Sequence, residues 1–551
     1  MTDLPHPATP PARARASLTP KLWTTLTTGY GWGPFRADLL AGLTVAIVAL
    51  PLAMALAIAS GTTPDKGLIT VVIAGFLISA LGGSRVQIGG PTGAFVVVVF
   101  NVIQQHGYDG LVLATLMAGL ILAVAGWTRL GGYIRYVPEP VVTGFTAGIA
   151  VIIFSSQVRD LLGLTMHGAP ADFFGKWAAF WAARDSLAPW AVGISAASLG
   201  VMVLLRRFAP RLPAFLIVVA GASVIAALAH LPVETIGSRF GELASTLPAP
   251  ALPAISLERL RDLAPSAFTI AFLAGVESLL SAVVADGMIG TRHRSNAELV
   301  AQGAANFASA LFGGLPATGA IARTATNVRS GGRSPVAGMA HAAFVLAFML
   351  LAGHWMTFVP LASLAAILVL VAWNMSEIPR FRRLLRAPMG DRVVLLASFI
   401  LTVTVDLTVA IAVGVVLAAV VFMHRMADLA GVEQGVSLAE AEEEDDHLLA
   451  EPTGGTRTLR LRGPMFFGAA SGLSEIMTGM LATGSKLPKS FRLDMADVPL
   501  IDASGVGVLR EFTERCEAHG VAVKLENLQA QPARVIAAMG VNDAPNGSPP
   551  R

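Results

Sequence analysis

Residues 313–327 read GGLPATGAIARTATN, and residues 89–95 contain a shorter version of the same pattern, GGPTGAF. Both stretches combine paired glycines, a proline and a Thr-Gly step within strongly apolar sequence. Backbone polar groups cannot stay unpaired in hydrocarbon, so a break of this kind at membrane depth is expected only where it is buried in protein or lines a cavity. The two stretches therefore predict a site inside a membrane protein.

The composition agrees with this prediction. Of the 551 residues, 54% are hydrophobic and 14% are charged, and the mean hydropathy is +0.66. Soluble domains carry about 25% charged residues, so an integral membrane protein is expected. The net charge of +3 gives no indication of nucleic-acid binding. Cys516 is the single cysteine, which excludes an internal disulfide framework and a cysteine metal cluster.

Apolar segments of about 20 residues, long enough to cross a bilayer, recur between residues 37 and 425. Two further segments, 92–105 and 318–328, are too short or too polar to span alone. Counting both gives fourteen elements. The twelve longer spans are predicted at 37–59, 67–82, 109–127, 138–158, 187–206, 213–229, 263–284, 296–312, 336–353, 358–373, 391–405 and 407–424.

The charge distribution predicts the orientation. With fourteen elements, every short basic loop falls on the same side of the membrane as the N-terminus, including those around Arg206, Arg292 and Arg380. Because basic loops stay on the cytoplasmic side, both termini are expected in the cytoplasm. No cleaved signal peptide is expected, since residues 1–17 lack an apolar core. The predicted location is a bacterial inner (plasma) membrane.

The chain changes character after residue 425. An acidic run, EAEEEDDH, occupies residues 440–447, and from residue 456 the pattern alternates between strands and helices, with a helix expected at 470–481. This alternation predicts a small cytoplasmic α/β domain. The predicted domains are a cytoplasmic tail at 1–35, a transmembrane transport domain at 36–425, an acidic linker at 426–455, the α/β domain at 456–543 and a tail at 544–551.

The two broken stretches fall in the third and the tenth element, which is an offset of seven. Because seven is odd, the second half would run through the membrane in the opposite direction, as in transporters built from inverted repeats. Each stretch would start a short helix, with Thr92 or Thr318 at the N-cap position. Two helix N-termini that meet at the midplane form an anion site. The alternative interpretation is a pair of ordinary helix kinks.

Glu277 lies midway along a predicted span, and Arg323 lies one to two turns into the tenth element. Such residues cost at least about 2.5–3.5 kcal/mol at the membrane centre and indicate a functional site. Arg323 would add positive charge beside the predicted helix N-termini, and Glu277 is a candidate coupling residue, with Ser278 and Ser281 beside it. The alternative is a permanent Glu277–Arg323 ion pair. Gln302 and Asn306 are expected to join helices rather than to contact substrate.

At these residues the chain resembles the sulfate permease family, the bacterial relatives of the solute carrier 26 anion transporters. The C-terminal stretch LDMADVPLIDASGVGVLREF at 493–512 resembles a STAS domain. The other matching stretches are DLLAGLTVAIVALPLAMALAIASG at 38–61, GGSRVQIGGPTGAFVVVV at 82–99, ESLLSAVVADG at 277–287 and AELVAQGAANFASALFGGLPATGAIARTATNVRSGGRSP at 297–335.

The resemblance implies a helical membrane protein with a seven-plus-seven inverted repeat and two half-helices. A core domain of elements 1–4 and 8–11 would move against a gate domain of elements 5–7 and 12–14. It also implies a homodimer and binding of a small anion, while Glu277 with Ser278 and Ser281 would couple transport to an ion. The substrate-binding positions implied are Thr92, Gly93, Ala94, Phe95, Thr318, Gly319, Ala320 and Arg323.

Two further positions follow from the resemblance. Leu52 follows Pro51 where many members have a glutamine, so the wall of the site is expected to be apolar and to suit a dicarboxylate such as fumarate. Ser504 matches the serine that is phosphorylated in stand-alone STAS proteins. Binding of a cytosolic partner at this loop without phosphorylation, or no regulated role at all, is the alternative for Ser504.

The sequence thus predicts proton-coupled symport of a small anion, either a dicarboxylate or sulfate or bicarbonate. Sodium-coupled bicarbonate symport is the nearest alternative, followed by an uncoupled exchanger or channel, a nucleobase symporter and a membrane-bound sensor. No cofactor beyond the transported H⁺ or Na⁺ is expected. No nucleotide-binding loop, catalytic triad or metal cluster indicates an enzyme.

Overall fold

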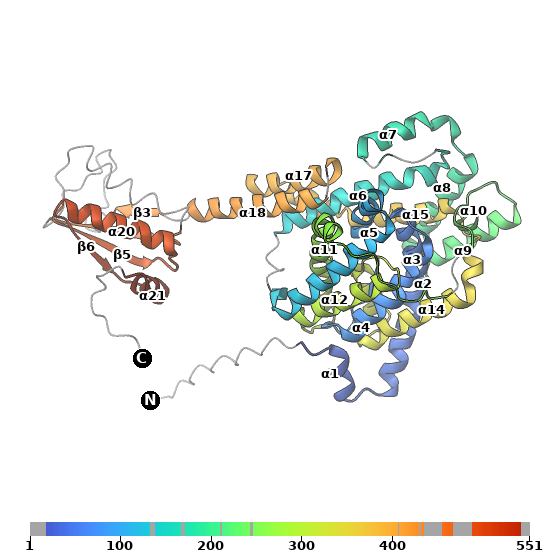
Figure 1. Ribbon diagram of the computed structural model, residues 1–551, viewed down its shortest axis with the longest axis horizontal. Coiled ribbons are helices and arrows are strands. Elements are labelled where there is room, and N and C mark those ends of the chain that lie inside the picture. The colour runs from blue at the N-terminus through green and yellow to red at the C-terminus, as the bar shows by residue number, and fades with distance from the viewer. Residues whose placement is uncertain are drawn as a thin grey trace. The chain divides into compact units, whose positions relative to one another are not determined.

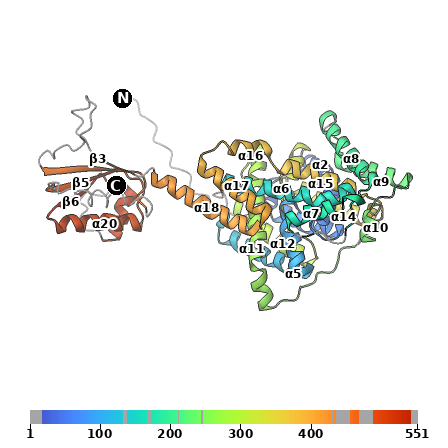
Figure 2. The same cartoon turned by 90° about the horizontal axis from the view of Figure 1, so that it is seen from above.

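The computed structural model describes residues 18–132, 138–166, 170, 172–209, 212–242, 246–405, 407–428, 431–434, 455–466 and 488–540. The chain divides into two compact units, Met1–Val415 and Val416–Arg551 (Figures 1 and 2). The first unit is helical, and the second contains a four-stranded sheet. This is the predicted combination of a helical membrane protein with a small α/β domain.

The first repeat contains seven elements. Its third and fourth elements are the two parts of α5, which are separated at Gly107, where the backbone leaves the helical region (φ 71°, ψ 177°). The second element is the helix Pro64–Leu81, whose middle section, Val71–Gly75, is π-helical. The elements are α2 (Trp32–Ala59), α3 and α4 (Pro64–Thr70 and Phe76–Leu81), both parts of α5 (Gly93–Trp127), α6 (Glu139–Leu162), α8 (Pro189–Phe208) and α9 (Ala214–Leu228).

The second repeat also contains seven elements, and its third is again a short helix that follows an extended segment. Among the residues that the structure describes, nine helices are long and apolar enough to cross a membrane. The elements of this repeat are α11 (Leu257–Ile289), α12 (Ser295–Leu311), α13 (Ile321–Arg329), α14 (Pro335–Met356), α15 (Leu361–Met375), α17 (Met389–Thr404) and α18 (Leu407–Asp428).

Several short helices were not predicted from the sequence. They lie outside the spans, and two of them have N-terminal caps: the Asp172 side chain accepts a hydrogen bond from the Gly175 amide in α7, and Thr235 and Ser238 form a capping box in α10. These helices are too short to give a clear hydropathy signal. They are α1 (Lys21–Thr27), α7 (Phe173–Ala182), α10 (Ile236–Phe240) and α16 (Ile378–Leu384), with 3₁₀ turns at Leu130–Gly132 and Arg184–Ser186.

The helices of the first unit pack mainly within two sets. In one set, α5 packs against α11 and α12, while α2 packs against α14. In the other set, α6 packs against α15 and α17, and α8 packs against α9 and α15. Small residues permit the closest approaches, since a Cβ at Gly119 of α5 would lie 2.7 Å from the Phe307 amide of α12. The extended segments that precede α5 and α13 lie within the first set.

The C-terminal unit has a sheet with the strand order β3-β4-β5-β6. β3 (Gly431–Gln434) is antiparallel to β4 (Thr456–Arg462), whereas β5 (Ser490–Asp497) and β6 (Ala522–Glu526) continue the sheet in parallel. The helices are α20 (Ala503–Ala518) and α21 (Ala530–Ala538). Alternating residues of the strands pack with α20 in a core that contains Leu493, Phe512 and the buried Cys516.

One prediction for this unit needs correction. The stretch 426–455 was expected to be only a linker, but β3 lies within it and pairs with β4. Four residues with a single valine are too few for a recognisable strand pattern. The helix predicted at 470–481 lies outside the described residues. Ser504 is exposed in the first turn of α20, and the Asp502 side chain caps this helix by accepting a hydrogen bond of 2.8 Å from the Gly505 amide.

Candidate anion site

The two glycine-rich stretches meet in the structure. Each forms a two-residue strand, and β1 (Gly89–Gly90) pairs antiparallel with β2 (Thr318–Gly319), so that Gly89 faces Gly319 and Gly90 faces Thr318. The Ala320 amide extends the pairing by donating to the Ile88 carbonyl at 2.8 Å. These bonds satisfy backbone groups that would otherwise be unpaired at membrane depth. The crossing brings the N-termini of α5 and α13 together, as predicted.

The cap positions differ in part from the prediction. Thr92 is the N-cap of α5, but Ala320, not Thr318, is the N-cap of α13. Thr318 lies in β2, is fully buried, and donates its hydroxyl to the Ala274 carbonyl of α11 at 2.8 Å. The prediction failed because the β1–β2 pairing extends the chain by two residues beyond Thr318. Thr318 therefore anchors the crossing to α11 through its side chain.

Thr92 connects the first half-helix to the candidate coupling residue. Its Oγ1 donates to Oε2 of Glu277 at 2.8 Å, and it makes no capping hydrogen bond to α5. The first amides of a helix have no partner within the helix. The amides of Gly93 and Ala94 are thus not capped by the Thr92 side chain, and they lie where the partial positive charge of α5 is concentrated.

Arg323 lies one turn inside α13 and is only 3% exposed. One guanidinium nitrogen donates to the Pro91 carbonyl, whereas Nε and Nη1 are buried without a hydrogen-bond partner. Among the residues that the structure describes, no carboxylate forms an ion pair with it. The expected alternative, an ion pair between Glu277 and Arg323, is therefore not formed as a direct contact in this structure, although the two groups act on each other electrostatically.

Two glycines make room for the polar side chains at the crossing. A Cβ at Gly90 would lie 2.5 Å from Nη1 of Arg323, and the φ of Gly90 is +149°, which disfavours other residues. A Cβ at Gly319 would lie 1.4 Å from the amide nitrogen of Gln87. Both glycines thus allow a polar side chain to pack directly against the backbone of the crossing.

A buried polar network beside the site was not predicted. Glu298 of α12, which is fully buried, accepts hydrogen bonds from the amides of Gly83 and Ser84 at 2.8 and 3.2 Å. It also accepts from the Ser278 hydroxyl and the Gln302 amide, both at 3.0 Å. Four donors compensate the burial of this carboxylate. The i, i+4 spacing of Glu298 and Gln302 within an apolar span was the available signal.

This network orients the helix that carries Glu277. Ser278 was predicted beside the coupling ion, but its hydroxyl faces Glu298, and Gln87 donates to it at 2.9 Å. Ser281 shares a hydrogen bond of 3.2 Å with Thr324 of α13. Asn306 contacts the backbone of Ala317 twice, at 2.8 Å each, so that α12 braces the approach to β2 as expected for a helix-joining residue.

The remaining predicted positions lie on the first half-helix and on α2. Ala94 and Phe95 are buried, whereas Leu52 is half-buried on α2. A Cβ at Gly93 would lie 3.1 Å from Sδ of Met375 and 3.2 Å from Cδ1 of Ile153. Helices α15 and α6 therefore close directly over the N-terminus of α5, which places the candidate site at the contact between the two sets of helices.

Comparison with known proteins assigns the chain to a family of transporters. The model of the Sulfate permease family matches residues 35–398, and the STAS domain model matches residues 447–549. The chain belongs to the sulfate permease family and carries a C-terminal STAS domain. It is a multi-pass anion transporter of the SulP/SLC26 type and not an enzyme, as the sequence predicted.

Two curated relatives support the assignment. The chain is 40% identical over 518 residues to the protein named "Putative sulfate transporter YvdB" of Bacillus subtilis (strain 168), and the match covers 93% of this chain and 95% of the relative. It is 31% identical over 462 residues to a protein of Picosynechococcus sp. named Bicarbonate transporter BicA, with 80% of each chain covered.

Solved structures agree with the fold. The structure of SLC26A9 matches with a TM-score of 0.82 at 20% identity and covers 94% of this chain and 88% of that one. The transmembrane domain of a cyanobacterial bicarbonate transporter, BicA, matches with a TM-score of 0.62 at 30% identity, and the match covers 71% of this chain and 98% of that domain. The first of these likenesses concerns the fold alone.

Proposed function

We propose that this chain is a secondary active transporter that moves a small anion together with a proton by alternating access. The anion binds between the N-termini of α5 and α13, beside Arg323. The observation that carries this proposal is the Arg323 guanidinium, which is buried at the crossing with two nitrogens unpartnered and no carboxylate paired with it. An unpaired charge in such a place is costly, and a bound anion removes that cost.

The anion has three sources of positive potential at this point. Arg323 supplies a full charge, and the two helix N-termini supply partial charges and free amides. Gly93 and Ala94 of α5 offer amides that the Thr92 side chain does not cap. The site therefore binds negative charge rather than a neutral nucleobase.

Glu277 is the proposed coupling residue. In the ionised form its carboxylate accepts a hydrogen bond from the Thr92 hydroxyl and adds a negative charge beside the anion site. Protonation removes that charge and gives Glu277 a proton to donate. Because protonation removes a repulsion, the proton and the anion bind more tightly together than either binds alone, as symport requires.

Sodium-coupled bicarbonate symport is the second candidate. The Glu277 carboxylate, the Thr92 hydroxyl and the nearby Ser281 hydroxyl supply oxygen ligands of the type that hard cations prefer. The resemblance to a protein named Bicarbonate transporter BicA favours this alternative. Replacement of external Na⁺ separates sodium coupling from proton coupling.

The choice of anion depends on the wall opposite the charges. Relatives are named for sulfate and for bicarbonate, whereas Leu52 supplies an apolar side chain where a glutamine would contact the substrate. We therefore expect a four-carbon dicarboxylate such as fumarate to compete well with the inorganic anions.

Uptake into proteoliposomes tests the proposal. The full chain is reconstituted, and labelled fumarate, sulfate and bicarbonate are supplied with an inward proton gradient and without sodium. Accumulation of one anion that collapses with the gradient supports proton symport, with Arg323→Ala expected to weaken the apparent affinity. Accumulation only with Na⁺ supports the second candidate, while flux without any gradient requirement contradicts coupled transport.

The proposal also covers the oligomeric state and the orientation of the chain in the membrane. We expect a homodimer in a bacterial plasma membrane with both termini in the cytoplasm, and STAS domains available to a cytosolic partner. Single cysteines introduced near Leu18 and at Arg184 test the orientation, because an impermeant thiol reagent added to intact cells should label only the second. Reversal of this pattern would contradict the orientation.

A further inference from the structure

A polar cavity lies along the first half of α5. Its volume is about 80 Å³, and it is enclosed by α5, α6, α7 and the end of α17. Polar groups from all four helices line it, unlike the apolar cavity of about 400 Å³ between α2, α9 and α14. The polar lining residues are Asn101, Ser155, Ser156, Asp172, Lys176, Thr402 and Thr404.

Lys176 is the cation of this cavity. Its side chain comes from α7, is only 6% exposed, and places Nζ at 5.3 Å from the centre of the Phe100 ring. Within the described part of the chain, no hydrogen bond or ion pair is formed by this ammonium. The Asp172 carboxylate instead accepts a hydrogen bond from the Gly175 amide, with 2.6 Å between Oδ2 and the amide nitrogen. Nζ of Lys176 thus has no direct hydrogen bond or salt bridge in the described part of the chain, although the nearby Asp172 carboxylate acts on it electrostatically, and it retains the capacity to bind an anion.

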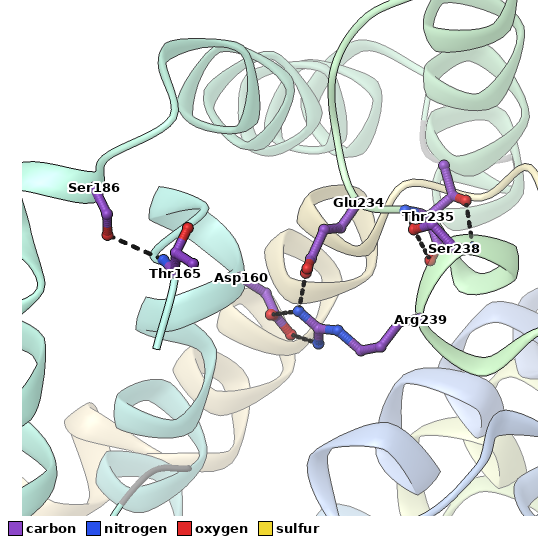
Figure 3. A network of polar contacts seen from close by, with 7 residues as sticks. All are labelled: Asp160, Thr165, Ser186, Glu234, Thr235, Ser238 and Arg239. Carbon is purple, nitrogen blue, oxygen red and sulfur yellow. Dashed lines mark hydrogen bonds and ion pairs between the residues drawn. The ribbon is translucent and has the colours of Figure 1, made fainter. Parts of the chain in front are cut away.

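Helix α7 is held firmly enough to position this lysine. Nε1 of Trp177 donates to the Ser155 hydroxyl of α6 at 3.1 Å, and Phe180 is buried against Val158 and Leu164. Both ends of the excursion that contains α7 are tied together, because the Thr165 amide donates to the Ser186 hydroxyl at 3.0 Å (Figure 3).

The C-terminal end of α6 is fixed as well. Figure 3 shows Arg239 bound to Asp160 at the end of α6, with nitrogen–oxygen distances of 2.8 and 3.2 Å, and to Glu234. A bidentate pair of this kind defines the geometry of both partners. The wall that carries Ser155 and Ser156 is therefore a defined surface opposite Lys176.

The position along α5 connects the cavity to the anion site. Phe100 lies seven residues after Gly93, which corresponds to about 10 Å along the helix. The cavity thus borders the outer part of the half-helix whose N-terminus faces Arg323. The same helices, α5 and α6, form its walls and meet at Gly93, where Ile153 approaches.

We infer that this cavity is an entry site for the transported anion on the α7 side of the membrane, and that Lys176 binds the anion there before it reaches the site at Arg323. The inference rests on the proposed function, because the ligand is the transported anion. The ligand class is a small inorganic or carboxylate anion, since the Lys176 ammonium and several hydroxyl groups line a small volume beside the Asp172 carboxylate, which accepts the hydrogen bond of the Gly175 amide.

A labelling experiment tests the site without relying on transport. Ser156→Cys places a thiol in the cavity, whereas the native Cys516 is buried. An impermeant thiol reagent is applied from the α7 side in the presence of sulfate, bicarbonate or fumarate. We expect at least one of these anions to slow labelling several-fold, and the protection to disappear when Lys176→Ala is added. Arg184→Ala, which removes an exposed cation from the same excursion, is the control and should retain protection.

Transport kinetics give the second readout. Lys176→Ala should raise the KM for uptake from the α7 side about tenfold and leave the KM for transport from the other side unchanged, while Lys176→Arg should restore it. A structural defect would alter both directions. Equal protection with and without Lys176, or no protection by any of the three anions, would overturn the inference. Protection without any flux would instead support the site and contradict the proposed transport.

Discussion

Gly90→Ala tests whether Arg323 binds the anion from its observed position. The new Cβ would lie 2.5 Å from Nη1 of Arg323, whereas carbon–nitrogen contacts normally lie about 3.5–4.0 Å apart. The guanidinium must therefore retreat by about 1 Å. We expect this movement to increase the distance between the guanidinium and an anion bound at the crossing.

The expected loss follows from the distance dependence of charge attraction. Opposite unit charges about 4 Å apart attract with about 4 kcal/mol at an effective dielectric constant near 20, and a separation of about 5 Å leaves about 3.3 kcal/mol. The difference, roughly 0.8 kcal/mol, corresponds to an affinity about fourfold weaker. The positive φ of Gly90 adds backbone strain of about 1–3 kcal/mol, which lowers the stability of the variant rather than its affinity for anions.

A double-mutant cycle separates these effects. Anion affinity is measured by titration of the purified protein for the wild type, Gly90→Ala, Arg323→Ala and the double variant, with thermal unfolding recorded for each. If Gly90→Ala acts through the guanidinium, it should have no effect on affinity once Arg323 is absent. A fourfold loss that persists in the Arg323→Ala background would refute the reasoning, as would unchanged affinity in Gly90→Ala.

Four further perturbations examine the rest of the molecule. Glu277→Gln should abolish proton-driven accumulation while anion binding persists, and full accumulation in this variant would remove Glu277 from coupling. Glu298→Ala leaves two buried backbone amides without an acceptor, at about 1–3 kcal/mol each, so its unfolding midpoint in detergent should fall markedly, with Glu298→Gln less affected. Deletion of residues beyond 430 should preserve anion affinity, since the candidate site lies wholly in the first unit; loss of binding in a folded variant would contradict this. Burial lowers the pKa of the Lys176 ammonium below its usual value, and the Asp172 carboxylate only partly opposes this shift. The ammonium therefore loses its charge as the pH on the α7 side rises. Uptake from that side should weaken at alkaline pH in the wild type but not in Lys176→Arg.

The sequence predicted the crossing because its signals are local. Paired glycines, a proline and a Thr-Gly step break a helix wherever they occur, and their spacing revealed the inverted repeat. The position of Thr318 could not be predicted in the same way, since it depends on how far β1 and β2 pair, which is a contact between residues more than 200 positions apart. The burial of Glu298 and Lys176 depends on α12 and α7 packing against distant helices. No periodic pattern within α12 specifies the four hydrogen-bond donors around Glu298. Likewise, no pattern within α7 specifies that Lys176 has no hydrogen-bond partner among the described residues.

The separation of Arg323 from Glu277 has a consequence for the mechanism. An ion pair between them would neutralise the site, and an anion would have to break that pair before it could bind. In the structure the carboxylate is held by Thr92 and the guanidinium by the Pro91 carbonyl, so the two charges are retained by neighbouring residues on one strand-to-helix turn. Under the proposed function, each charge then remains available for a different ligand: Arg323 for the anion and Glu277 for the coupling ion. Since both are anchored to the start of α5, a shift of this half-helix would move the two together, which favours coupled transport over an open anion channel.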